Sequence, residues 1–301
     1  MIRPSVYLPL RLAAAALLLS TGPVFAQSPD PAAAQSPDVP VAPPIPTQID
    51  LNLINLPTTM SIARHHSYFR LTHRFAGDLR RGDFGDLAAD LFTIDKGAII
   101  GLEYRFGITS NIQAGVHRSL LSKTIQTFGR WDAVRQGTSL PVAISFTGSF
   151  EGLNNLRENH QPGVAITVSR TFNDRLALYA TPAFVGNTHA ADFISGHEGH
   201  DHDTGLEDVP DEHAGHHDTW FMGLGGRLRF SGTGYITGEY TPRMAGYDPN
   251  SAEWGVAIEK RTGGHTLQLN FTNCFGTTLG QIARGGSPHD VYLGFNITRR
   301  F

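Results

Sequence analysis

The sequence predicts an all-β protein, a transmembrane antiparallel up-and-down β-barrel of about twelve strands. Three observations carry this prediction. Many segments alternate between bulky apolar side chains and polar or small ones, which is the period of a β-strand. Long and short connections follow one another in turn between these segments. After residue 26, no stretch reaches the roughly 20 apolar residues that a membrane-spanning helix needs.

Residues 1–26 have the features of a secretory signal peptide. Arg3 and Arg11 are basic, residues 12–19 are all alanine and leucine, and Val24-Phe-Ala26 is a small-residue cleavage site. The apolar run is too short to span a membrane. A secreted chain that crosses a membrane without helices must do so as a closed barrel, because hydrocarbon offers no partner to an open strand edge.

Residues 27–48 are predicted to form a disordered, Pro/Ala-rich periplasmic tail. This segment has seven prolines and repeats Gln27–Asp30 as Gln35–Asp38. It has too little apolar surface to offset the entropy of ordering. Residues 49–301 are then the predicted outer-membrane β-barrel, and the weakly alternating Ile49–Leu56 is expected to pack in the barrel mouth.

Twelve strands are expected between residues 60 and 301. For the fourth, a helical turn is the alternative. The predicted strands are Met60–Phe75, Gly97–Phe106, Asn111–Leu120, Lys123–Arg130, Leu140–Phe150, Pro162–Phe172, Arg175–Gly186, Thr219–Phe230, Thr233–Arg243, Ala252–Lys260, His265–Thr272 and Asp290–Phe301.

The two faces of these strands differ in the way that a membrane barrel requires. Over residues 142–150 and 220–230, bulky apolar residues alternate with small or polar ones, so the bulky file would face lipid. A soluble sandwich gives the same alternation in one dimension. The alternation alone therefore does not decide between the two.

Connection lengths favour the membrane barrel. From a periplasmic amino terminus, six connections would be extracellular, and five of them are long; most of the others are tight turns such as Asn173-Asp174. A sandwich has no reason to follow this asymmetry, which is typical of outer-membrane barrels. The five long connections are Ala76–Lys96, Glu151–Gln161, Asn187–Asp218, Met244–Ser251 and Asn273–His289.

The chain ends on an alternating segment, Val291–Phe301, whose last residue is aromatic. Such an ending looks like the assembly signal of bacterial outer-membrane barrels, although Arg299 stands where an aromatic residue is more usual. The expected location is therefore the outer membrane of a Gram-negative bacterium. The expected partners are outer-membrane lipid and, through the last strand, the barrel-assembly machinery.

Several short motifs resemble a family of bacterial outer-membrane barrels known as a domain of unknown function. The resemblance spans most of Leu56–Phe301, and the order of the motifs makes it specific. It implies the barrel fold and the envelope location, and it supplies no catalytic residue. The motifs are His73-Arg-Phe-Ala-Gly77, Phe84-Gly-Asp-Leu87, Ala114-Gly-Val-His-Arg-Ser119, Gln136 with Pro141-Val-Ala-Ile-Ser145, and Leu293-Gly-Phe-Asn-Ile-Thr-Arg299.

Composition excludes two classes of protein. Without Arg3 and Arg11, 22 basic side chains remain against 27 acidic ones, so nucleic acid is not an expected partner. Cys274 is the only cysteine, so no intramolecular disulfide can form, and an incidental free thiol is the expected reading.

A loop over residues 196–218 is the one segment whose composition points to a ligand. It carries six histidines, eight carboxylates and no basic residue. Imidazole suits Zn²⁺, Cu²⁺ and Ni²⁺, and carboxylates complete their shells. The alternative is a solvated rim loop without a ligand, and no cofactor is required in either case. The candidate metal ligands are His197, His200, His202, His213, His216, His217, Asp201, Asp203 and Asp218.

Charged side chains fall on the files predicted to face the lumen, and two interpretations stay open. They either pair across the lumen and fill it, because buried charges need partners, or set the selectivity of a narrow aqueous path. These residues are Arg70, Arg74, Glu103, Arg105, His117, Arg227, Arg229, Glu239, Arg243 and Glu259.

The expected function is restricted passage or surface binding of small polar solutes or metal ions by a protein that is not an enzyme. The alternatives are a structural or adhesive envelope barrel with a filled lumen, and a membrane-embedded hydrolase. No local pattern selects a nucleophile and its base. His73 is expected to point outward near one rim, as an interface residue.

Overall fold

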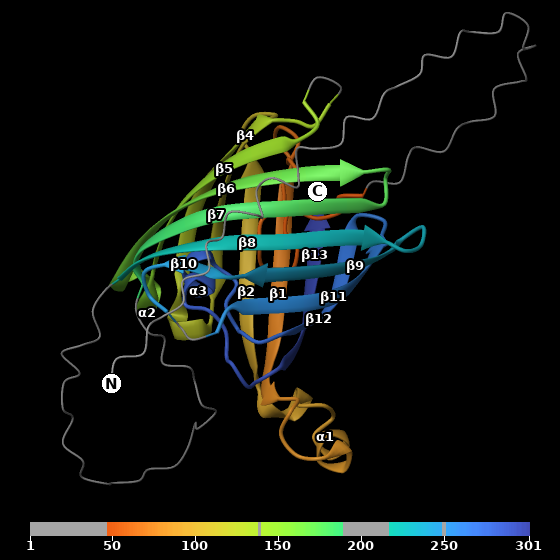
Figure 1. Cartoon of the computed structure of the whole chain (residues 1–301), viewed down its shortest axis with the longest axis vertical. Helices are drawn as coiled ribbons and strands as arrows, with labels where there is room; N and C mark the ends of the chain where they lie inside the picture. The colour runs from red at the N-terminus through yellow and green to blue at the C-terminus, as the bar shows by residue number, and fades with distance from the viewer. Residues whose placement is uncertain (1–46, 138–139, 189–216, 249–250) are drawn as a thin grey trace, which may run out of the picture. The chain divides into compact units, whose positions relative to one another are not determined.

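The computed structural model describes residues 47–137, 140–188, 217–248 and 251–301. Within them, one antiparallel sheet closes on itself (Figure 1). Each long strand pairs with its neighbours along the chain, β13 pairs with β1, and β8 pairs directly with β9 and, further along, with the three-residue β10. β10 follows β9 directly after Pro242, so the wall is a ring of twelve long strands, as the sequence predicts.

The strands are β1 (Ser67–Asp78), β2 (Ala98–Gly107), β3 (Ile112–Ser119), β4 (Ile125–Val134), β5 (Ala143–Gly152), β6 (Glu158–Phe172), β7 (Leu176–Thr188), β8 (His217–Arg229), β9 (Gly234–Thr241), β10 (Arg243–Ala245), β11 (Glu253–Thr262), β12 (His265–Thr272) and β13 (Tyr292–Arg300). The short helices are α1 (Phe84–Ala89), α2 (Leu153–Leu156) and α3 (Leu279–Ala283), with 3-10 turns η2 (Ile94–Lys96) and η3 (Leu121–Lys123). No helix of the described residues is long and apolar enough to cross a membrane.

The predicted strand positions are confirmed, with two differences. The first strand begins at Ser67 instead of Met60, because residues 60–66 lead up to it along the barrel rim and pair there with the end of β2 through His65 and Gly107. The connection predicted over 151–161 shrinks to residues 153–157, because β5 and β6 extend toward each other. The fourth strand is a strand and not a helical turn.

Cross-strand register puts one apolar file outside and one polar file inside all round the barrel. Phe146 pairs with Ile166, and both are exposed, whereas the next residue, Ser145, is fully buried. This is the pattern of a wall that meets hydrocarbon outside and polar groups inside.

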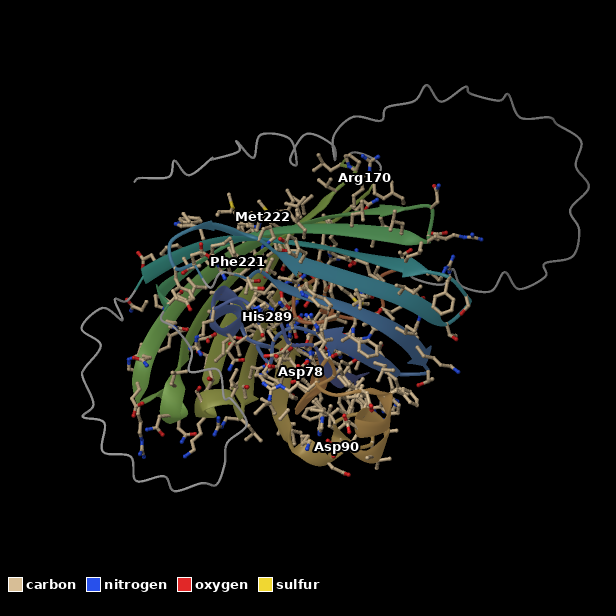
Figure 2. All side chains as sticks on the ribbon, turned by 60° about the horizontal axis from the view of Figure 1, so that its bottom comes forward. Asp78, Asp90, Arg170, Phe221, Met222 and His289 are labelled. Atoms are coloured by element: carbon tan, nitrogen blue, oxygen red, sulfur yellow. The ribbon has the colours of Figure 1, made fainter. Side chains whose placement is uncertain are left out.

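The two ends of the barrel differ. At one end the connections are short, and Ser67 pairs with Phe301, which closes the ring; we call this end the short-turn rim. At the other end lie the α1 connection, the β12–β13 connection and the strand ends Thr188 of β7 and His217 of β8; we call it the long-loop rim. Arg170 and Asp90 lie at these opposite ends, the first at the short-turn rim (Figure 2).

Two segments fill the inside of the ring. We call Thr47–Thr59 the plug; its apolar side chains are fully or nearly fully buried. We call Asn273–Val291 the inner loop; it carries α3, whose Leu279, Ile282 and Ala283 pack against the inner faces of β6, β7 and β8 (Figure 1). The core of the barrel therefore lies in its lumen.

Candidate functional site

The candidate site is the lumen, whose wall is polar and charged. Many inward residues of the strands are hydroxyl, amide or charged side chains that are at most 6% exposed, and most of the others are glycine or alanine. Such groups are costly to bury unless they are hydrogen-bonded. Their partners are found mainly in the plug and the inner loop.

The plug is a tight turn held by its own backbone. The N–H of Leu53 donates to the carbonyl of Leu56 at 2.8 Å, and the N–H of Thr58 donates to that of Leu51 at 2.9 Å. Asn52 and Pro57 form an isolated bridge. This turn leaves the N–H groups at its tip without partners inside the plug, so the wall must supply them.

Glu239 of β9 supplies them. Its carboxylate accepts hydrogen bonds from the backbone N–H groups of Ile54, Asn55 and Leu56, each at 2.9–3.0 Å. On β11, Glu253 accepts a hydrogen bond from the Asn55 side-chain amide at 2.9 Å. Two carboxylates on neighbouring strands thus hold the tip, and hydrogen bonds to charged acceptors are the stronger kind.

Arginines hold the carbonyl side of the plug. Arg70 donates to the carbonyl of Ile54, and Arg74 donates to the Asn55 side-chain oxygen at 3.0 Å. From the opposite wall, Arg227 donates to the carbonyl of Asn52 at 2.8 Å while it binds Glu259 at 2.7 Å. Donors and acceptors of the plug therefore both meet charged partners.

Three inward glycines make room for the apolar side chains of the plug. A Cβ at Gly223 would lie 2.7 Å from a Leu56 methyl carbon, and one at Gly255 would lie 2.9 Å from the Ile54 methyl carbon. A Cβ at Gly225 would overlap Leu53. Real Cβ atoms do not approach other atoms so closely, so these positions act as sockets for the plug.

Below the long-loop rim, the inner loop is anchored by a buried carboxylate. Glu151 accepts hydrogen bonds from the Thr278 hydroxyl at 2.9 Å and from the N–H of Gly280 at 3.0 Å. Thr278 and Gln281 form a capping box that begins α3. The loop is therefore fixed in the lumen by polar contacts, as the plug is.

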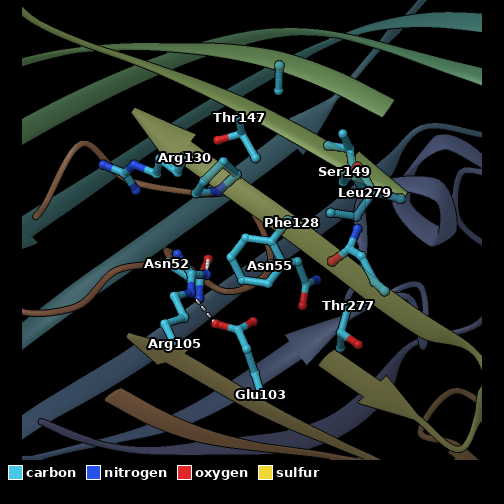
Figure 3. A pocket seen from close by; sticks show the side chains of 14 residues that line it. Asn52, Asn55, Glu103, Arg105, Phe128, Arg130, Thr147, Ser149, Thr277 and Leu279 are labelled. Atoms are coloured by element: carbon cyan, nitrogen blue, oxygen red, sulfur yellow. Dashed lines mark hydrogen bonds and ion pairs between the residues drawn. The ribbon is translucent and has the colours of Figure 1, made fainter. Parts of the chain in front are cut away.

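A small cavity remains between the plug and the inner loop. Its volume is about 50 Å³, and the wall includes Asn52, Glu103, Arg105, Arg130 and Thr277 (Figure 3). This is room for a few water molecules, because one water needs only about 10–15 Å³ on the same measure. This cavity, formed by described residues, is too small for larger solutes.

The charged residues predicted to face inward do form pairs, but the pairs lie along the wall, within one strand or between strands one or two places apart, and not across the lumen. Glu103 contacts Arg70 at 3.5 Å, Arg105, and the Nδ1 atom of His117 at 3.2 Å. Arg70, Arg74, Arg227, Glu239 and Glu259 are also fully or almost fully buried. Two others of the predicted set, Arg229 and Arg243, are only half-buried near the two rims.

His117 also has a hydroxyl partner. Its Nε2 atom lies 3.0 Å from the Thr277 hydroxyl, while its Nδ1 atom faces Glu103. A hydroxyl, an imidazole and a carboxylate in this order are the relative positions of a nucleophile, its base and the group that orients the base. The sequence does not show this arrangement, because Thr277 and His117 lie 160 residues apart.

Most of the predicted metal ligands lie outside the described residues. His197, His200, His202, His213, His216, Asp201 and Asp203 belong to that part, and only His217 and Asp218, at the start of β8, are described. Asp218 accepts a hydrogen bond from the N–H of Asn187 at 3.3 Å. Within the described ranges, no three His, Cys, Asp or Glu side chains are grouped to hold a metal ion.

The structure also describes the outward residue His73 and the single cysteine, Cys274. His73 faces outward and stacks on Phe295, with 4.6 Å between ring centroids. Cys274 is buried at the start of the inner loop, and burial raises the pKa of its thiol well above the usual value. A buried neutral thiol is inert.

A family model described as "Membrane bound beta barrel domain (DUF5777)" matches residues 50–301. The chain belongs to this family. The match confirms the family resemblance that the motifs between His73 and Arg299 indicated. It begins at Asp50 and therefore includes most of the plug. For this membrane-bound β-barrel family, the lipid-facing file and the closed ring are the expected features.

Solved structures with similar barrels are entitled as porins and channels. A NanC porin is 8% identical over 77% of this chain and 97% of its own, with a TM-score of 0.47. A KdgM porin is 8% identical over 78% and 99%, with a TM-score of 0.46. An outer membrane channel from Pseudomonas putida F1 is 10% identical over 80% and 97%, with a TM-score of 0.43. A comparison with curated proteins gives no match.

Sequence reasoning missed the depth of the plug and two of its anchors. It placed Ile49–Leu56 at the barrel mouth, whereas the tip reaches Arg74 in the middle of β1. It also left out Glu253 and Glu151, which hold the plug and the inner loop. For Glu253, its position on the polar file of a predicted strand was the available signal, whereas Glu151 was predicted to lie in a connection.

Proposed function

We propose that this protein is an outer-membrane barrel of a Gram-negative bacterium that restricts the passage of small polar solutes, and that the plug closes its lumen. The observation that carries the proposal is the grip of Glu239 on the plug tip, three backbone N–H groups on one carboxylate. Polar contacts of this kind exchange readily for contacts with water. The buried isoleucine and leucine side chains of the plug favour the closed state, so the open state should be the minor one.

The charge of the lumen wall supports an aqueous path. Arg70, Arg227 and Glu259 are buried behind the plug, and water would solvate them once the plug moved. Replacing a buried ion pair by apolar residues is often neutral or stabilising. A barrel whose only task was structural would therefore gain nothing from so many charges, whereas a conducting path needs a polar lining.

A hydrolase is the second candidate, and the Thr277, His117 and Glu103 arrangement is the observation that favours it. Two features weigh against it. The adjoining cavity of about 50 Å³ admits water but no ester substrate. The N–H groups of Thr277 and Gly280 are already bound to Gln281 and Glu151, so they are not free to stabilise an oxyanion. We therefore propose that this set fixes the inner loop and that the protein is not an enzyme.

The histidine-rich loop is proposed as a binding site for Zn²⁺, Cu²⁺ or Ni²⁺. The support is its composition, six histidines and eight carboxylates over residues 196–218. In the sequence it lies between β7 and β8, whose described ends at the long-loop rim are Thr188 and His217. In the proposed orientation this rim faces the outside of the cell.

Current through single barrels tests the proposed passage. Purified full-length protein in a planar bilayer should show a closed baseline with discrete openings that become more frequent as the applied voltage rises. The Glu239→Gln variant should open more often than the native chain. Complete silence of both proteins, with correctly folded barrel shown by heat-modifiable migration, would contradict passage and favour the structural alternative.

A further inference from the structure

The short-turn rim carries a strong excess of positive charge. Nine basic residues occupy the ends of strands and the turns there, and all are exposed or half-buried. Asp174 is the only exposed acidic residue in the described turns and strand ends of this rim. We call these nine residues the basic ring: Arg64, Arg135, Arg170, Arg175, Arg229, Lys260, Arg261, Arg299 and Arg300.

Three members of the basic ring lie on the lipid-facing files. On β6 the outward residues Ile166 and Val168 are followed by Arg170. β11 has Val256 and Ile258 followed by Lys260, and β13 has Phe295 and Ile297 followed by Arg299. In each strand the cation is the next same-face residue after two apolar ones.

This position fixes the depth of the cations. Same-face residues are two apart, and a strand rises about 3.3 Å per residue, so each cation lies about 7 Å along its strand from the apolar side chain before it. That side chain belongs to the hydrocarbon-facing file, and each strand ends within two residues of its cation, so the cation lies where hydrocarbon meets the headgroup layer. Long basic side chains in this position extend their charge toward water and keep their stems in the apolar layer.

Aromatic rings accompany two of the three. The Arg170 guanidinium lies over the Phe172 ring and that of Arg299 over the Phe301 ring, each 4.8 Å from the ring centroid. Aromatic girdles mark the interfaces of transmembrane barrels. The pairs therefore place the cations beside rings that belong at the membrane boundary.

Among the described residues, the long-loop rim has no comparable excess of positive charge. Asp78, Asp83, Asp86, Asp90 and Asp95 lie there among its basic residues, and Lys96 pairs with Asp90 at 2.9 Å. Charges at this rim are mixed, so it attracts anions weakly. The two leaflets of the membrane thus meet surfaces of different charge.

We propose that the basic ring binds the phosphate groups of anionic phospholipids, with Arg170, Lys260 and Arg299 as its lipid-facing contacts. In the orientation proposed above, the leaflet concerned is the periplasmic one. The attraction does not depend on whether the lumen opens. It would hold the barrel at a fixed depth and enrich anionic lipid around the strand ends where β1 and β13 close the ring.

The test removes the three lipid-facing charges together. Full-length protein is inserted into vesicles of phosphatidylethanolamine and phosphatidylglycerol, extracted in mild detergent, and the retained lipids are counted by native mass spectrometry. Arg170→Gln, Lys260→Gln and Arg299→Gln in one chain should lower retention of phosphatidylglycerol by about fivefold per charge, since each cation near an anionic surface contributes about 1 kcal/mol. Raising the salt concentration should weaken retention by the native chain.

A matched control loses three charges at the other rim. Arg80→Gln, Lys123→Gln and Arg157→Gln remove exposed cations from the long-loop side and should leave phosphatidylglycerol retention at the native level. Equal retention by the native chain and the Arg170, Lys260 and Arg299 variant would overturn the proposal.

Binding to soluble peptidoglycan fragments is measured on the same proteins. If the variant lost that binding while its lipid retention stayed unchanged, the proposal would also be overturned, because the ring would then contact the cell-wall polymer. Absence of channel current together with normal phosphatidylglycerol retention would contradict the proposed passage and still support lipid binding by the basic ring.

Discussion

Both oxygens of the Glu239 carboxylate lie within 3.0 Å of the backbone nitrogen of Asn55, although the two residues are 184 positions apart in the chain. This contact joins the tip of the plug to the middle of the barrel wall. The neighbouring N–H groups of Ile54 and Leu56 share the same carboxylate. Glu239 is therefore the side chain that binds most backbone N–H groups of the plug tip.

Glu239→Gln should loosen the plug. The neutral amide has one acceptor oxygen in place of two and no charge, and a hydrogen bond to a charged group contributes about 1.5–3 kcal/mol. The fraction of time spent open should rise by roughly tenfold or more in bilayer recordings. Glu158→Gln, at an exposed carboxylate that binds Asn154, is the control and should behave as the native chain does. An unchanged opening frequency in the Glu239 variant would show that this contact does not hold the plug.

Gly225→Val should displace the plug by steric overlap. Its side chain would occupy the space of Leu53, whereas Gly148→Val on the outer face of β5 meets nothing within 4 Å. Both variants keep a strand-favouring residue in a strand, so both barrels should assemble. Limited proteolysis of the reconstituted protein should cut within Thr47–Thr59 in the first variant only. Equal protection of the plug in both would mean that the socket is not needed.

Removing Phe301 should reduce insertion into the outer membrane. Phe301 continues β13 and exchanges hydrogen bonds with Ser67, so it completes the seam that closes the ring. An unclosed seam leaves strand edges without partners in hydrocarbon. The amount of heat-modifiable barrel in the outer-membrane fraction measures the effect. A normal amount in the deletion strain would count against an assembly role for this residue.

Replacing His197, His200, His202, His213, His216 and His217 with serine should abolish Zn²⁺ binding in calorimetry, because the eight carboxylates alone are a weaker set. Histidine must be deprotonated to bind a metal, so affinity in the native chain should fall as pH drops through roughly 6.5. Simple attraction to the carboxylates would persist to about pH 4. Undiminished binding by the serine variant would take the histidines out of the site.

The barrel was predictable because alternation and connection length are both local in the sequence. The alternation of Phe146 and Ser145 already separates an apolar face of the strand from a polar one. The pairing register then assigns the other residues of the strand to these two faces. The connection over 151–161 was predicted too long because Glu158–Gln161 carries no clear alternation, yet it pairs with β5 or continues β6. The residue at which a strand begins or ends depends on its pairing with the neighbouring strand, and the sequence of one segment does not show that pairing.

The lumen was less predictable for a physical reason. Gly223 and Gly225 look like generic small inward residues, and only the three-dimensional structure shows that Leu56 and Leu53 occupy the space they leave. The plug is not a long paired strand, and the weak alternation of Ile49–Leu56 does not show how deep it lies. Inward charges were predicted, and the structure shows that they serve the plug as much as one another.

Deleting Thr47–Thr59 tests the central claim most directly, since it removes the plug and leaves every strand of the ring. The native chain and the deletion are compared in the same planar bilayer, after heat-modifiable migration has shown that both are folded. The plugged-lumen account predicts a closed baseline with brief openings for the native chain and a steady ion current for the deletion. A deletion barrel that stays as closed as the native chain would contradict it.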